Sequence, residues 1–492
     1  MAVAGDLTEW EWLARLGPKL VSRQPVVKYW RDYYDGCQDL PTGPTQHEEA
    51  FRRFQRLART NLCLLCAESM VHRMQVVGYN SNRPGERNMG DNPLWKLWQE
   101  ARLDARQYTV YRRAFSRSEA YVIVGTDPNK PLKPRITIEG PENVIVETDP
   151  ADASKRLAAL RMWHDSIAKK WMVTLYLPGE RYHWQTVKDY KSCDDSLIML
   201  RWDKVAWEDR IEPARSFPEV PVIPFCNGDE GEEPRAEFDP GIDVQNRLNL
   251  TVLNRLSSER YAAYRQRYMV NYEPDTDELT GLPISPYNPG TTQLWTAPPP
   301  EPGQPEIRFG DFSQTDTSQM LRGCEADMRA FAAVTLTPVY YLPGDMINVS
   351  ADAVAALDAG HIAKVRQRMA LWGERWEEML TLMAWAADIP GDFSQGEVVW
   401  GRPENFNPAQ TADYATKLVA AGFPLTMVAE EIGWSPQRVA QLRAEQAAST
   451  LLASAANAAN PVPPVPATPG VPPAPAGPAE QPSPNGAPVP AP

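Results

Sequence analysis

Basic side chains are scarce in this sequence relative to acidic ones. Its 492 residues include 50 Lys and Arg against 63 Asp and Glu, which gives a formal charge of −13 at pH 7. Proteins that coat nucleic acid or bind membrane surfaces recruit their partners through excess positive charge. The charge balance therefore argues against both of these classes.

Cysteines and long apolar runs are also few. Six cysteines are too sparse for a disulfide framework in a chain of this length. No segment offers about 20 apolar residues free of charge and proline, so we expect no membrane span. Asp6, Glu9 and Glu11 stand where a signal peptide needs apolar residues. These absences predict an intracellular, reduced and soluble protein.

Motifs that carry chemistry are missing as well. The dipeptide Gly-Lys, which ends a phosphate-binding P-loop, does not occur, and the five histidines are scattered singly. Gly391 to Gly396 resembles a nucleophile elbow but has one residue too many before its serine. Cys63, Cys66 and His72 come nearest to a zinc site, yet buried structural cysteines are the favoured interpretation. We predict no catalytic, cofactor-binding or metal-ligating residues and no cofactor.

Proline is abundant, and its surplus is concentrated near the end of the sequence. Residues 461–492 hold 14 of the 48 prolines and a single charged side chain, Glu480. Such a composition favours extended polyproline II conformations and leaves nothing to bury. We expect a disordered Pro/Ala-rich tail over residues 453–492.

The first half of the sequence changes from a helical to a strand pattern. Residues up to about 115 show apolar side chains at helical spacing, and Thr8 with Glu11 forms a potential capping box. From Ala120 to Asn227 short β-branched and aromatic runs alternate with proline and glycine. This pattern predicts an α+β region with a largely antiparallel sheet.

Long helices dominate the second half. A helix is expected over residues 241–270, a Pro- and Gly-rich excursion over 271–312, and a second helix over 317–334. Residues 335–349 break the pattern, and Ser350 can cap the longest helix of the chain. An apolar seam typical of helix packing follows at Val365, Met369, Trp372, Trp376, Met379 and Met383. We interpret this seam as ordinary core.

One segment has the pattern of a helix-turn-helix. Residues 424–445 include Ile432-Gly433-Trp434-Ser435-Pro436 between two helical stretches. Groove contacts could come only from Gln437, Arg438, Gln441 and Arg443, and the flanks are not basic. A structural helical hairpin is therefore favoured over DNA reading.

Several of these motifs together resemble the portal proteins of long-tailed bacteriophages, in the lineage common among phages of actinobacteria. The resemblance spans about residues 25–445. Its earlier cues are Tyr33-Tyr34-Asp35-Gly36, a helix from Asn61 that ends in Val77-Gly78-Tyr79, Val220 to Phe225, and Asn246-Arg247-Leu248-Asn249. The most specific block runs from Thr337-Pro338 through Tyr341-Leu342, Gly344, Asn348-Val349-Ser350, Ala355-Ala356 and Lys364-Val365-Arg366 to Trp376-Glu377-Glu378.

The resemblance implies an α+β, portal-like fold with an α/β wing, a long helical stem, a small clip excursion, a long kinked helix and a helical crown. The implied boundaries are wing 1–240, first stem helix 241–270, clip 271–312, second stem helix 313–334, tunnel loop 335–349, long wing helix 350–390, crown 391–452 and tail 453–492. In this scheme Pro343 and Gly344 shape the tunnel loop. Asp345, Met346 and Asn348 meet the DNA, and Ile347 lies between them.

The implied function is a ring, usually of twelve subunits, at one capsid vertex, through which DNA is packaged and later ejected. Implied partners are other copies of the chain, the terminase large subunit, a head-tail adaptor, the major capsid and scaffolding proteins, and duplex DNA passing without sequence specificity. The location would be the virion, after assembly in the host cytoplasm. An acidic chain without a P-loop fits a conduit whose motor is a separate ATPase. The alternatives are a DNA-binding regulator using residues 424–445 and an unrecognised cytoplasmic enzyme.

Overall fold

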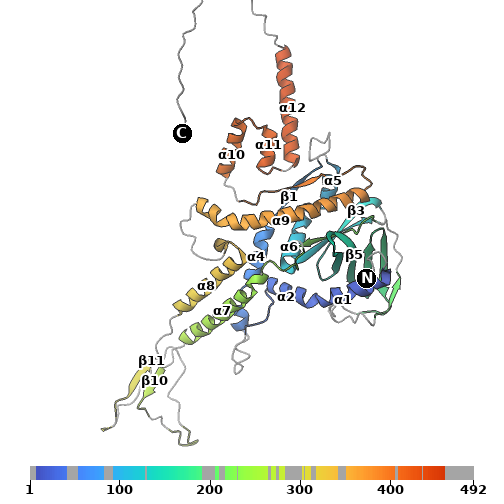
Figure 1. Cartoon of the computed structure of the whole chain (residues 1–492). Helices are drawn as coiled ribbons and strands as arrows, with labels where there is room; N and C mark the ends of the chain where they lie inside the picture. The colour runs from blue at the N-terminus through green and yellow to red at the C-terminus, as the bar shows by residue number, and fades with distance from the viewer. Residues whose placement is uncertain are drawn as a thin grey trace, which may run out of the picture. The chain divides into compact units, whose positions relative to one another are not determined.

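The computed structural model describes most of the chain and divides it into two units, within residues 1–440 and 441–492 (Figure 1). No described helix combines the length and the apolar character needed to cross a membrane. The residues described are 7–41, 54–81, 92–127, 130–190, 205–209, 217–229, 231–263, 267–272, 276–282, 302–303, 305–311, 317–341, 351–404, 408–434 and 436–459.

The first unit begins with two consecutive helices, α1 (Glu9–Ser22) and α2 (Gln24–Tyr34). The predicted capping box of α1 is present, because the Thr8 backbone N–H donates to Glu11 Oε2 at 2.8 Å while Thr8 Oγ1 accepts from the Glu11 N–H. Trp12 and Leu16 on the buried face of α1 belong to a core cluster shared with a sheet. Amphipathic patterning thus docks α1 on that sheet.

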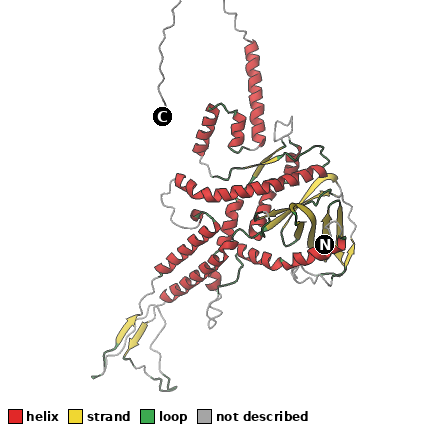
Figure 2. Ribbon diagram, in the orientation of Figure 1, coloured by secondary structure: helices red, strands yellow, loops and turns green. Residues whose placement is uncertain are grey.

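Two antiparallel sheets follow, where the strand patterns predict a single, largely antiparallel sheet. They lie together at one side of this unit in Figure 2. The smaller sheet has the order β3-β2-β9 and the larger β4-β5-β6-β7-β8, and every strand pair within them is antiparallel. The strands are β2 (Glu119–Asp127), β3 (Lys130–Glu139), β4 (Val144–Asp149), β5 (Asp152–Asp165), β6 (Lys170–Leu177), β7 (Glu180–Thr186), β8 (Trp207–Asp209) and β9 (Val222–Cys226).

The main core forms where helix α9 (Ala351–Ala386) packs on β2, β9 and the helices of the N-terminal half. Those helices are α4 (Leu62–Val71), α5 (Pro93–Glu100) and α6 (Leu103–Arg117). Trp372 and Trp376 are fully buried, and the Trp372 ring stacks on Tyr111 at 5.5 Å between centroids. All six residues of the predicted Met/Trp seam are buried, which confirms the core interpretation.

One predicted helix is interrupted. The sequence pattern predicts a helix from Asn61 to Tyr79, whereas α4 ends at Val71 and strand β1 (Val76–Asn80) follows. β1 pairs antiparallel with β12 (Glu397–Trp400). Two valines favour strand, and the Tyr79 ring covers Gly396, where a Cβ atom would lie 1.9 Å from the Tyr79 hydroxyl oxygen. Pairing with a segment more than 300 residues away thus overrides the local helical spacing.

Two long helices, α7 (Ile242–Ala263) and α8 (Ser318–Thr335), lie side by side (Figure 1). Gly241 permits the close approach at their base, because a Cβ there would lie 2.6 Å from the Phe331 ring. Arg247 and Thr251 of α7 bind Asp327 of α8 at 2.7 and 2.9 Å. The helix predicted over 241–270 is thus shorter, and β10 (Arg267–Val270) pairs instead with β11 (Arg308–Asp311).

The remaining helices are short until the last. α10 (Pro408–Ala420) contacts α11 (Leu425–Glu431), and α12 (Pro436–Ala459) spans the boundary between the two units. α12 therefore continues beyond residue 452, where the sequence analysis ends the helical region. Residues 461–492, which are the proline-rich part of the predicted tail, lie outside the described residues.

Candidate functional site around the ends of residues 342–350

The predicted DNA-facing loop lies between two well-packed ends. Pro343, Gly344, Asp345, Met346, Ile347 and Asn348 all lie outside the described residues. Tyr341 is the last described residue before them, and α9 begins after them at Ala351. The described part of the candidate site therefore consists of the residues on either side of 342–350.

The incoming end is shaped by the termination of α8. Leu336 adopts a left-handed conformation with φ of 55°, and Pro338 cannot continue a helix, so the chain turns into a short 3-10 helix at Val339–Tyr341. The buried Thr335 hydroxyl donates to the Phe331 carbonyl at 2.8 Å. Thr337 contacts both the Thr335 hydroxyl and the Cys66 thiol on α4. The end of α8 is thereby tied to α4.

Arg73, just after α4, connects the two ends of the loop. Its guanidinium donates to Tyr341 Oη at 2.7 Å on the incoming side and to Asp358 Oδ2 at 2.9 Å on α9. A third bond, of 2.9 Å, reaches the carbonyl oxygen of Pro403. Both side chains of the Arg73–Asp358 ion pair are only 5% exposed. One guanidinium thus holds together three segments that are distant in the sequence.

Tyr340 completes this cluster, which we call the Arg73 cluster and define as Arg73, Tyr340, Tyr341 and Asp358. The Tyr340 hydroxyl donates to Asp358 Oδ1. Burial and then the hydrogen bond to this carboxylate raise the pKa of Tyr340, so the phenol stays protonated at neutral pH. Each oxygen of the buried Asp358 carboxylate consequently has its own donor.

His361, one turn further along α9, is buried beside the Arg73 cluster. Its ring nitrogens lie 3.3 Å from the Leu336 carbonyl oxygen and 3.4 Å from that of Ser69. Burial lowers the pKa of His361, and the positive charges of Arg73 and Lys364 act in the same direction. A neutral imidazole carries a single N–H, so it donates to only one of the two carbonyls at a time.

Lys364 provides the last attachment. Its ammonium donates to the Thr335 carbonyl at 3.0 Å and forms an ion pair with the buried Glu237 carboxylate. This lysine belongs to the Lys364-Val365-Arg366 motif noted in the sequence. Arg73, Asp358 and His361 were missed as site residues, because no spacing in the sequence brings together residues 285 positions apart.

Two other sequence hypotheses can be placed in the structure. Cys63 and Cys66 are each 1% exposed in the core, as the structural interpretation predicts, whereas His72 is exposed and lies 3.4 Å from Glu68. In the segment resembling a helix-turn-helix, a turn joins α11 to α12. Arg438, one of its potential groove contacts, lies over the Trp434 ring at 5.5 Å.

Comparisons with known proteins agree on one family. The family model described as phage portal protein, SPP1 Gp6-like, matches residues 22–449. The portal protein of Mycobacterium phage D29 is 26% identical over 417 residues, which cover 77% of each chain. That of Mycobacterium phage L5 is 24% identical over 412 residues, which cover 79% of each chain.

A solved structure described as the neck of an empty GTA particle, computed with C6 symmetry, overlaps 80% of this chain and 94% of that chain. Its TM-score is 0.38 at 10% identity, a likeness too small to bear on the fold. The α+β architecture and the family match define a phage structural protein. The chain belongs to the phage portal protein family, SPP1 Gp6-like. The predicted family and its actinobacteriophage-type lineage are therefore confirmed.

Removal of one partner of the buried ion pair should be strongly destabilising. Arg73→Met leaves Asp358 buried without its charge partner, and we expect a loss of about 3–5 kcal/mol in the free energy of unfolding. Urea denaturation measures this loss. Arg15→Met is the matched control, because Arg15 is half exposed and Glu147 keeps its second partner Lys19. The assignment of Arg73–Asp358 as a buried, structurally important ion pair would be contradicted by either of two results. One is a loss of more than about 1 kcal/mol in the free energy of unfolding for Arg15→Met, and the other is a loss of less than about 1 kcal/mol for Arg73→Met.

The burial of His361 predicts a specific pH dependence. Its pKa in the folded chain is lower than the ordinary 6.5, so the unfolded chain takes up the proton first as the pH falls. The stability that depends on neutral His361 is complete above pH 6.5 and is lost as the pH drops towards the folded-state pKa. His361→Gln should show a flatter stability profile between about pH 8 and pH 5. Parallel profiles for the two proteins would refute this.

Proposed function

We propose that this chain forms a ring, most simply of twelve copies, that serves at one capsid vertex as the channel for DNA packaging and ejection. Membership of the portal family carries the proposal. We assign the wing, stem, clip, tunnel loop, long helix and crown to the boundaries given in the sequence analysis. In this assignment α7 and α8 form the stem and β11 belongs to the clip. β10 pairs with β11, so we move the start of the clip from residue 271 to residue 267.

Apolar side chains exposed at the end of α8 and on α9 support assembly into a ring. Leu336 and Leu357 are 60% and 62% exposed on either side of the loop. A ring needs a heterologous interface, in which one face of each subunit meets a different face of the next. Apolar patches that stay uncovered in one chain suit such a face. The other large apolar side chains exposed on the described parts of α7, α8 and the 3-10 helix are Leu250, Leu321, Val334 and Val339.

We further propose that residues 343–348 face the DNA in the channel. Pro343 and Gly344 would shape the loop, and Asp345, Met346 and Asn348 would meet the duplex. Every phosphate that a protein neutralises releases counterions and adds binding free energy, which would resist sliding. An acidic chain avoids this, since twelve copies carry a formal charge of roughly −156. The Arg73 cluster, His361 and Lys364 would hold such a loop at both ends.

The proposed partners follow from this role. A terminase large subunit would drive DNA through the ring, and a head-tail adaptor would bind it after packaging. Major capsid and scaffolding proteins would surround it at the vertex of the virion, after assembly in the host cytoplasm. The chain itself would perform no covalent chemistry and need no cofactor or metal. Among the described residues no group of His, Cys, Asp and Glu side chains is arranged to hold a metal ion.

Ring formation is the direct test. The purified chain should give annular particles in negative stain and a species of many subunits in mass photometry. Leu336→Asp/Leu357→Asp places charges on the proposed interface and should shift the population to protomers by about tenfold or more. Ile167→Asp, a change at a 93% exposed position in the turn between β5 and β6, should leave the rings intact. A chain that stays monomeric at every concentration, with no rings in virions, would overturn the proposal.

A charge reversal tests the loop separately from the ring. Asp345→Lys should add phosphate contacts, slow DNA translocation and lower packaged genome length or titre, while rings still form. Asp152→Lys makes the same charge change at an exposed position on β5 and should package normally. Normal packaging by Asp345→Lys would remove Asp345 from the channel lining without affecting the ring assignment.

A further inference from the structure

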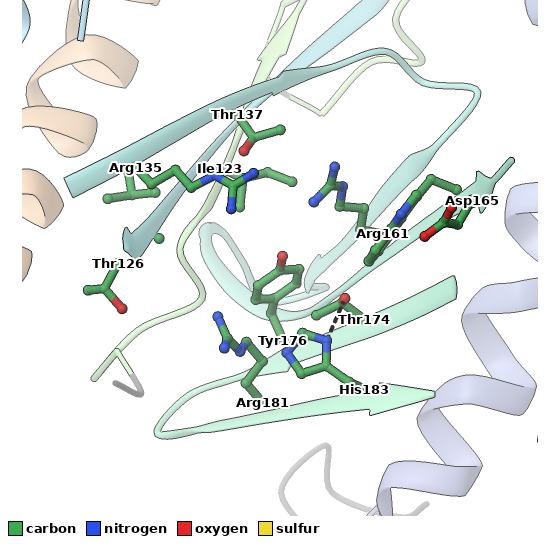
Figure 3. Close-up of a pocket in the computed structure, with 13 residues that line it drawn as sticks. Ile123, Thr126, Arg135, Thr137, Arg161, Asp165, Thr174, Tyr176, Arg181 and His183 are labelled. Atoms are coloured by element: carbon green, nitrogen blue, oxygen red, sulfur yellow. Dashed lines mark hydrogen bonds between the residues drawn. The ribbon is translucent and has the colours of Figure 1, made fainter. Parts of the chain in front are cut away.

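We propose that a cavity between the two sheets binds a small phosphate-type oxyanion. The cavity has a volume of about 300 Å³ and is lined by β2 and β3 on one side and by β5, β6 and β7 on the other (Figure 3). Three arginines from three different strands line it: Arg135 on β3, Arg161 on β5 and Arg181 on β7. The proposal does not depend on ring formation.

Strand pairing explains why polar groups gather on one face. Arg161 pairs with Thr174, which pairs in turn with His183, so the members of this row on β5, β6 and β7 are all polar. Two residues along β6, Tyr176 pairs with Arg181. Side chains two residues apart on a strand point to the same face, so both rows face the cavity. Arg135 and Thr137 occupy alternate positions on the opposing strand β3.

Arg161 is held in a fixed orientation. Its Nη2 donates to Glu139 Oε1 at 2.6 Å, and its guanidinium carbon lies 4.3 Å from the centroid of the Trp163 ring. Its Nε is buried, and no hydrogen-bond partner for it exists among the described residues. A donor left unsatisfied in this way costs free energy that an acceptor in the cavity would recover. Arg161 is therefore a preorganised anion contact.

The side chains of Arg135 and Arg181 form no ion pair or hydrogen bond within the described part of the chain, and Arg135 is exposed while Arg181 is half-buried. In Figure 3 their guanidinium groups approach the same central space as Arg161 and the Tyr176 hydroxyl. The carboxylates nearby are engaged, since Glu139 binds Arg161 and Asp165 accepts from the backbone N–H groups of Ile167 and Ala168. Counted over the described residues, the three arginines and the carboxylates of Glu139 and Asp165 leave one net positive charge at the cavity, in a chain of net charge −13.

The donor set favours a tetrahedral oxyanion. Guanidinium groups bind phosphate oxygens through two parallel N–H bonds, and hydroxyl groups can complete the coordination. Thr126, Thr137 and Tyr176 supply hydroxyl groups from the cavity wall. The volume equals about ten water molecules, so a phosphate ester with a small organic group fits as well as free phosphate. Small-ligand sites begin at about this size.

Isothermal titration of the full chain with inorganic phosphate and with AMP, at constant ionic strength, tests the proposal. We expect one site per chain for at least one of them, and preference for AMP would identify an ester as the ligand. Arg135→Gln/Arg181→Gln should weaken binding about tenfold or more, and Arg181→Gln alone should weaken it less. Neither change removes a side-chain bond within the described residues, so folding should be retained, as circular dichroism would verify.

Lys155→Gln is the matched control, because it changes the charge by the same amount per residue at an exposed position on β5. Its affinity for phosphate should stay within about twofold of the unchanged chain. The absence of phosphate and AMP binding, or equal binding by the double variant, would overturn the proposal. Binding of acetate as tight as that of phosphate would show that the cavity attracts anions only by its charge, and would overturn the proposed specificity for a phosphate-type oxyanion. Displacement of bound phosphate by a short DNA duplex would reject a small ligand in favour of a polynucleotide.

Discussion

Burial of one face of α9 is the constraint on which the rest of the first unit depends. Trp372, Trp376 and Met379 are fully buried against α5, α6 and strands β2 and β9. At one end of this seam the contacts are apolar and aromatic. At the other, where α9 follows residues 342–350, Asp358, His361 and Lys364 are polar and still buried or half-buried. A single helix thus provides both the core and the frame of the candidate site.

Burial of the polar residues at this end of α9 costs desolvation free energy. That cost bears on their role in the structure. Desolvation of an ion pair often cancels its attraction, so the Arg73–Asp358 pair is weak evidence for stability. Its directional bonds nevertheless permit few alternative arrangements, because Tyr340, Tyr341 and the Pro403 carbonyl must all meet the same two side chains. Apolar residues could pack there in several ways. We infer that the cluster serves to fix the positions of the segments before and after residues 342–350, although removal of one partner alone is destabilising.

Local sequence patterns predicted the individual helices and strands better than they predicted which distant segments pair or pack together. The Met/Trp seam, the Thr8–Glu11 capping box and the strands over 120–227 follow from spacing and propensity, which act within one turn or one strand. The pairing of β1 with β12 does not, because Val76 and Trp400 meet only in the folded chain. For the same reason Arg73 and His361 carried no signal in the sequence. The family resemblance supplied the class of protein, but it pointed to the loop and not to its frame.

Arginines in this acidic chain occur in two settings, in ion pairs with carboxylates and along the cavity between the two sheets. Several arginines form ion pairs with carboxylates of the same chain, so their positive charge is neutralised within the fold. They are Arg23, Arg112 and Arg156. A surface that duplex DNA must slide past benefits from this arrangement, since unpaired cations would hold phosphates. Arg135 and Arg181 form no ion pair within the described residues, and they lie between two sheets rather than on a helix of the stem. Together with Arg161 they line one cavity, a position that suits a small anion better than the passage of DNA.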